Sequence, residues 1–150
     1  MPVAQFTRTI DVGLDAGTCW ERLTDIGRVA QWVSIVGAIQ ELEPLRAYTA
    51  VLEDRMGPFR LRADLVIDVT EVVDGRTVRL RAAGEDRQVA SRLAVDATLR
   101  LDGVGDGTTV TVDGTYEVTG RIATLGASMI RNKADKLLEE FFAAAGRELQ

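Results

Sequence analysis

The side chains that could do acid–base chemistry in this 150-residue chain are carboxylates and tyrosines, because the sequence contains no histidine. That absence removes the usual general base near neutral pH and every triad built on imidazole. Asp64, Asp68 and Asp96 alternate with apolar residues, so we expect them on the solvent-facing side of strands. Tyr116 falls on the apolar side, where its phenol could orient a ligand carbonyl or bind a backbone group. We therefore predict no catalytic residue.

Metal and phosphate chemistry is equally poorly supported by the residues. Cys19 is the single cysteine, so the chain can form neither an internal disulfide nor a cysteine cluster for zinc. We expect it to be a small buried hydrophobe. The glycine-rich run 103–107 precedes a strand, whereas a phosphate loop leads into a helix. We predict no metal site and no cofactor.

Composition and charge limit the class of protein and its partners. Hydrophobic residues make up 46% and charged residues 27% of the sequence, which is typical of one globular domain spanning 1–150. Eighteen Lys and Arg against 23 Asp and Glu give a net charge of −5, without a basic stripe for nucleic acid. Neither a leader nor a membrane span is evident, so we expect a cytoplasmic protein with at most peripheral membrane contact.

The periodicity of apolar residues predicts an α+β fold. Residues 3–12 are typical of a strand, and 15–33 of two short consecutive helices. Residues 38–118 alternate with period two through a series of runs separated by turns, and 120–147 change to helical period. We predict a seven-stranded antiparallel sheet whose apolar face is covered by the two short helices and the long C-terminal helix.

The order of the hairpins indicates where a ligand could bind. Alternate turns of a meander fall at the same end of the sheet, which brings together 57–58, 84–86 and the start of the long helix at 120. A twisted sheet around a straight helix should leave a void under the first helical turns. Four inward positions are unusually small: Ala63, Ala82, Ala97 and Gly114. The alternative is that these residues only make room for aromatic side chains in a solid core.

The wall of this predicted cavity is apolar. The residues that we expect to line it are Trp32, Val36, Val51, Leu65, Ile67, Val78, Leu80, Val95, Ala97, Val112, Tyr116, Leu125 and Met129. Such a wall favours an aromatic or isoprenoid-like ligand and disfavours a phosphorylated one. The hairpin tip at 56–59 carries two large apolar residues, which suit a gate, a partner contact, a shallow membrane contact or a tip packed onto the core.

Two stretches of sequence resemble known families. The element order resembles the helix-grip fold of the START-like, Bet v 1-like or SRPBCC superfamily, and Asp25 to Trp32 resembles its D-x6-W signature. Residues 36–143 more narrowly resemble the family of the G-type accessory protein of carbon monoxide dehydrogenase. The matching features are Val36-Gly37, Tyr48, Met56-Gly57-Pro58, Gly107-Thr108-Thr109-Val110, Gly120-Arg121-Ile122-Ala123-Thr124-Leu125-Gly126 and Phe141-Phe142.

This resemblance implies an accessory factor of molybdenum-containing dehydrogenases that carries a quinone-like or lipid-like ligand. It adds Tyr48 to the expected lining and implies that Met56, Gly57, Pro58 and Phe59 form the cavity entrance, near which Arg121 also lies. It implies no metal, flavin or nucleotide.

The sequence thus favours non-catalytic binding of a small lipophilic ligand by an accessory or carrier protein. The alternative is an enzyme of the polyketide cyclase or dehydrase type, in which a cavity carboxylate or Tyr116 acts on an aromatic substrate. A third possibility is an interaction module with a filled core, which would show no cavity.

Overall fold

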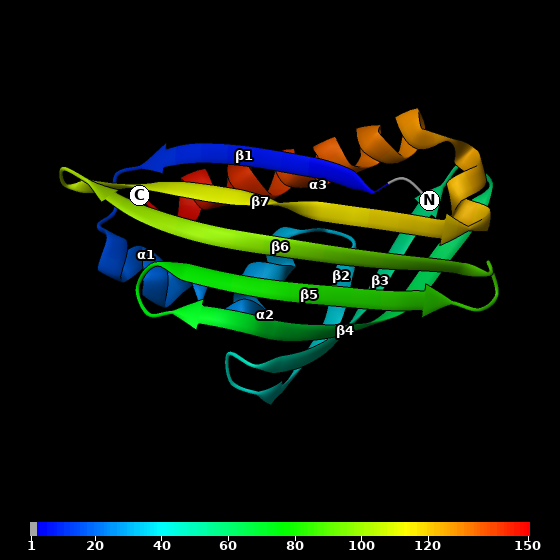
Figure 1. Cartoon of the computed structure of the whole chain (residues 1–150), viewed down its shortest axis with the longest axis horizontal. Coiled ribbons are helices and arrows are strands. Elements are labelled where there is room, and N and C mark those ends of the chain that lie inside the picture. Colours follow the sequence, from blue (N-terminus) through cyan, green and yellow to red (C-terminus); the bar gives the residue numbers. More distant parts are fainter. Residues whose placement is uncertain (1–2) are drawn as a thin grey trace.

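A curved antiparallel sheet of seven strands dominates the computed structural model, which describes residues 3–150 (Figure 1). The strands are β1 (Ala4–Val12), β2 (Val36–Glu43), β3 (Ala47–Met56), β4 (Phe59–Val73), β5 (Thr77–Asp86), β6 (Ser91–Val104) and β7 (Gly107–Gly120). Their order is β1-β7-β6-β5-β4-β3-β2. From β2 onward every strand pairs with its neighbour in sequence, and β1 pairs with β7. The predicted meander is therefore confirmed.

The helices lie against one face of this sheet. They are α1 (Ala16–Leu23), α2 (Ile26–Val29), α3 (Ala127–Glu148) and two 3₁₀ segments, η1 (Ala30–Trp32) and η2 (Arg121–Leu125). Asp15 caps α1, since its Oδ2 accepts a hydrogen bond of 3.0 Å from the Thr18 N–H. In Figure 1 the long helix α3 runs behind β1 and β7, with α1 near its C-terminal end.

The expectation of one continuous helix over 120–147 is wrong. Gly120 and Gly126 have φ values of 88° and 96°, which lie outside the α-helical region. These two residues bound η2 as a separate 3₁₀ segment, and α3 begins only at Ala127. The chain consequently turns twice between β7 and α3.

One end of the space between sheet and helices is solidly packed. Leu149, after the last turn of α3, is fully buried, and its carbonyl oxygen accepts a hydrogen bond of 3.3 Å from Leu14 N–H. We call this cluster the packed end. Its buried members are Val12, Cys19, Leu23, Leu101, Val110, Ala145 and Leu149. The C-terminal half of α3 is thereby fixed against β1, β6, β7 and α1.

Polar contacts fix α3 on both flanks. On the β1 side, the Arg8 guanidinium lies 2.9 Å from Asp135 Oδ1. On the β2 side, Ser34 donates both its backbone N–H and its hydroxyl to the Glu140 carboxylate, the latter at 3.0 Å. These contacts tie α3 to β1 and to the segment before β2, near the two edges of the curved sheet.

Asp86 stabilises the turns at the other end of the sheet, opposite the packed end. It is 5% exposed, and its carboxylate accepts backbone N–H groups from Arg62, Gln88 and Val89 at 2.6, 2.9 and 3.1 Å. Burial by itself raises the pKa of Asp86, but these three donors outweigh it and bring the pKa below its ordinary value of 3.8. Asp86 is therefore a structural carboxylate.

Replacing Asp86 by Asn is expected to lower the free energy of unfolding at pH 7 by about 2 kcal/mol, because buried N–H groups lose a charged acceptor. A carboxylate whose pKa is depressed in the folded state contributes stability above its unfolded pKa and loses it as the pH falls. The difference between wild type and variant should therefore shrink as the pH falls below about 4. Urea unfolding at several pH values measures this, with Glu85→Gln as the exposed control. An equal difference at pH 7 and pH 2 would contradict the assignment.

No helix within residues 3–150 is both long and apolar enough to cross a bilayer.

Candidate functional site

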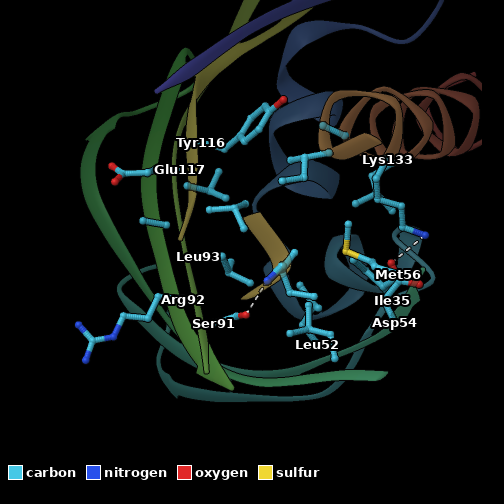
Figure 2. Close-up of a pocket in the computed structure, with 18 of the residues that line it drawn as sticks. Ile35, Leu52, Asp54, Met56, Ser91, Arg92, Leu93, Tyr116, Glu117 and Lys133 are labelled. Carbon is cyan, nitrogen blue, oxygen red and sulfur yellow. Dashed lines mark hydrogen bonds and ion pairs between the residues drawn. The ribbon is translucent and has the colours of Figure 1, made fainter. Parts of the chain in front are cut away.

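The candidate site is a cavity of about 240 Å³ under the first turns of α3 (Figure 2). It lies at the end of the sheet that carries the β3–β4 and β5–β6 turns and the start of η2, which is where the hairpin order places a void. Strands β1, β3, β4, β6 and β7 form its wall, together with Ile35, η2 and α3. The lining residues are Phe6, Ile35, Leu52, Asp54, Met56, Leu61, Ser91, Arg92, Leu93, Ala94, Val95, Tyr116, Glu117, Val118, Ile122, Ile130, Lys133, Ala134, Leu137 and Leu138.

The wall of the cavity is almost entirely apolar. Two of its charged residues, Arg92 and Glu117, occupy outward-facing positions of β6 and β7, and their side chains point away from the cavity (Figure 2). Leucine and valine side chains from the sheet face the aliphatic side chains of α3. Such a surface gains free energy by burying an apolar ligand and offers little to an ionic one.

Ser91 lines the cavity, but its hydroxyl is already used by the protein. Ser91 Oγ donates to the Val89 carbonyl at 3.0 Å and accepts from the Ile122 N–H at 3.0 Å, the bond drawn in Figure 2. Ile122 is 2% exposed and fixes η2 as the floor of the cavity. Ser91 is therefore a structural link between β6 and η2.

Asp54 and Lys133 form an ion pair at the edge of the cavity, between β3 and α3 (Figure 2). Lys133 Nζ lies 2.8 Å from Asp54 Oδ2, and the two side chains are 28% and 12% exposed. Apart from this ammonium, the buried Oδ2 has no hydrogen-bond partner among residues 3–150. Asp54 Oδ1 accepts the backbone N–H of Arg55 at 2.8 Å.

Tyr116 separates the cavity from a surface groove. Tyr116, Val118 and Ile130 line both spaces, and the groove continues between the start of β1 and Arg131 of α3. The ring of Tyr116 stacks on Phe6, with ring centroids 6.4 Å apart and an interplanar angle of 29°. The tyrosine thus forms the thin wall nearest to this groove.

The structure brings few of the sequence-predicted lining residues to this cavity. Val95 and Tyr116 line it, and Ala97 and Val112 lie further along the same face of β6 and β7. A second cluster, beneath α2 and β2, contains Val36, Tyr48, Leu65, Ile67 and Leu80. Trp32 packs on the packed end, and Val78 is buried outside the cavity.

Two of the predicted residues lie on surfaces that cannot face the cavity. Val51 pairs with Asp64 on the opposite side of the sheet, because the inward positions of β3 are Tyr48, Ala50, Leu52 and Asp54. Met129 is 45% exposed and does not line the cavity, in contrast to the expectation.

The residues expected at the entrance pack around one end of the cavity. Met56 lines the cavity, and Phe59 packs with Met56 and Leu125 on a cluster around Leu61, Val89 and Ile122. A Cβ atom added at Gly57 would lie 3.0 Å from Leu125 Cδ2, so the hairpin tip packs directly on η2. Pro58 and Arg121 are exposed at this end.

Two cavity residues that the sequence analysis missed, Asp54 and Lys133, could have been found by their positions on the apolar faces of β3 and α3. Asp54 is in phase with Tyr48, Ala50 and Leu52, whose alternation marks the inward face of β3. Lys133 lies three residues after Ile130 and four before Leu137, on the same side of the helix. Both residues are polar members of otherwise apolar faces.

Within the described residues, no group of three or more Asp, Glu or Cys side chains is arranged to hold a metal ion. The chemistry available in the cavity is therefore that of an apolar wall, one carboxylate–ammonium pair and one phenol.

Comparison with known families gives one match over nearly the whole chain. Residues 3–148 match the family described as polyketide cyclase / dehydrase and lipid transport. No curated protein matches the sequence. The family, a member of the SRPBCC superfamily, associates this chain with binding of hydrophobic ligands.

Solved structures establish the helix-grip fold. A conserved protein from Geobacillus kaustophilus is similar at a TM-score of 0.85 and 20% identity, over 97% of this chain and 95% of that one. A START superfamily protein from Mycobacterium smegmatis is similar at 0.70 and 15%, over 97% and 96%. Ara h 8.0201 is similar at 0.64 and 12%, over 97% of each chain. The fold is thus START-like and Bet v 1-like, as the sequence indicates.

Proposed function

The chain belongs to the polyketide cyclase/dehydrase and lipid transport family, and from this premise we propose that it binds a small lipophilic ligand in the cavity under α3. The single observation that carries the proposal is the apolar wall of that cavity, about 240 Å³ in volume. Natural ligand pockets of this kind are mostly apolar, with a few polar groups that fix orientation.

The volume limits the size of the ligand. An engineered apolar cavity of about 150 Å³ binds benzene, so this one suits a body of about two fused rings or a short isoprenoid chain. A phospholipid or a steroid would require the helix to move away from the sheet. The proposed ligand is therefore a small aromatic or isoprenoid lipophile.

Wild-type protein is expected to bind naphthalene with one-to-one stoichiometry and a Kd on the order of 10 µM, because ten carbons leave water for an apolar wall. Equilibrium dialysis measures this binding, with naphthalene disulfonate as the charged control of similar shape. Native mass spectrometry of protein from its own host should also show a retained lipophile. A cavity that took up neither naphthalene nor a host lipophile would refute the proposal.

We further propose that this binding serves an accessory or carrier role similar to that of the G-type accessory protein of carbon monoxide dehydrogenase, with a molybdenum-containing dehydrogenase as partner. The run from Gly120 to Gly126 supports this, because in this chain it forms η2, the floor of the cavity. Co-purification of such a dehydrogenase with the tagged protein from its host would test the partner.

One observation favours the enzyme alternative, a polyketide cyclase-like reaction on an aromatic substrate. Asp54 and Lys133 place a carboxylate beside an ammonium at the cavity edge, and such groups could remove a proton next to a carbonyl and stabilise the enolate oxygen. Turnover of an aromatic β-ketoester by wild type, lost in Tyr116→Phe or Asp54→Asn while binding persists, would favour this alternative over the carrier.

A further inference from the structure

The ion pair between Asp54 and Lys133 is not accounted for by the stability of the fold. Taking a carboxylate and an ammonium out of water is costly, and replacing such a pair with apolar residues of similar size is often neutral or stabilising. Here the pair stands beside aliphatic side chains of the cavity wall (Figure 2). A leucine and a methionine would continue that wall without any polar group.

The pair also retains hydrogen-bonding capacity. An ionised carboxylate oxygen accepts at two lone-pair positions, and within the part of the chain that the structure describes the buried Asp54 Oδ2 has the Lys133 ammonium as its one polar neighbour. What shields it is the Lys133 side chain, which is 28% exposed and has a long flexible stem. Because a carboxylate oxygen accepts at two positions, a ligand hydroxyl can donate to Oδ2 beside the Lys133 ammonium, which stays paired with Asp54.

We propose that the Asp54–Lys133 pair is the polar contact of the cavity and selects an uncharged lipophile that carries one hydroxyl group. This inference rests on the proposed function. A hydroxyl both donates and accepts, so one group can donate to Asp54 Oδ2 and accept from Lys133 Nζ. The apolar body of the ligand then lies against the aliphatic wall.

Other polar groups fit the pair less well. A ligand carboxylate would place a second negative charge beside Asp54, and a ketone or quinone oxygen can accept from Lys133 but cannot donate to Oδ2. The Ser91 hydroxyl already makes two hydrogen bonds within the protein. The expected class is therefore a phenol or an alcohol of about two rings.

Equilibrium dialysis of naphthalene, 1-naphthol and 1-naphthoate tests the inference with three probes of one shape. Wild-type protein should bind 1-naphthol at least about tenfold more tightly than naphthalene, because a hydrogen bond to a charged group is gained. 1-Naphthoate should bind most weakly. Each result is the ratio of two Kd values measured on the same protein. A change in cavity shape that affects all three probes equally therefore leaves the ratio unchanged.

The double variant Asp54→Leu/Lys133→Met removes the pair and keeps side-chain volume. It should fold with unchanged or higher thermal stability, and its preference for 1-naphthol over naphthalene, measured as the ratio of the two Kd values, should disappear. The matched control is Glu53→Gln/Arg62→Gln, which removes an ion pair of 3.2 Å on the exposed side of β3 and β4 and should leave the ratio unchanged.

The outcomes separate this inference from the proposed function. Equal binding of naphthalene and 1-naphthol by wild type, tightest binding of 1-naphthoate, or a preference for 1-naphthol that persists in the double variant would each overturn the inference while the lipophile-binding function stands. Failure of all three probes to bind would overturn both.

Discussion

Replacing Ala134 by Phe should abolish naphthalene binding, with a loss of affinity of at least about 100-fold, while the protein stays folded. Ala134 faces the cavity from α3, and a phenyl ring at this position occupies the space that the ligand needs. Because the ring enters an existing void, the free energy of unfolding should change by less than about 1 kcal/mol or rise. Dialysis and urea unfolding of the same preparation measure both quantities.

Ala145 provides the matched control for this substitution. It lies eleven residues further along α3, about three helical turns, and so on the same side of the helix. It is fully buried within the packed end, where no space remains for a ring. Ala145→Phe should therefore cost about 3 kcal/mol or more by overpacking. If both variants lowered the free energy of unfolding equally, the two ends would not differ in packing. That result would contradict the presence of a cavity beside Ala134.

The second large effect is expected at Gly120, where β7 ends and the chain turns into η2. A Cβ atom there would lie 2.0 Å from the Ala90 carbonyl oxygen, and the φ of 88° is in the region that favours glycine. Gly120→Ala should lower the free energy of unfolding by at least about 3 kcal/mol, since backbone strain and a direct clash combine.

Gly75 separates these two contributions. Its φ of 75° is similar, but a Cβ atom there would have no heavy atom within 4 Å. Gly75→Ala should therefore cost only about 1 kcal/mol, the strain of a left-handed residue alone. Chemical unfolding of both variants measures the difference. A Gly120→Ala protein as stable as Gly75→Ala would mean that η2 does not hold this position against β6.

The sequence contained most of the information about the sheet and less about the site. Alternation identified the inward side of β4 to β7 because each of these strands places apolar residues mainly in one phase. In β3 both phases carry apolar residues, and Val51 was expected to face inward, whereas Ala50 and Leu52 occupy that side. Because Asp54 is in phase with Ala50 and Leu52, it was not predicted to line the cavity.

The location of the cavity within its end of the sheet also escaped sequence analysis. Several residues of β3 to β5 that were expected to line the cavity pack instead in the second cluster around Tyr48 and Ile67, beneath α2 and β2. Where a helix crosses a curved sheet depends on its starting point, and here Gly126 delays the start of α3. Neither strand curvature nor this offset is encoded in apolar periodicity.

Cys19 makes it possible to measure whether the packed end and the cavity end open separately. The chain's single thiol is fully buried in α1, its Sγ donates to the Leu14 carbonyl at 3.6 Å, and burial raises its pKa. An alkylating reagent can react with it only when α1 separates from the sheet, so the alkylation rate reports the opening of that region alone. A ligand beneath the opposite half of α3 slows this rate only if both halves of the molecule open in one cooperative event.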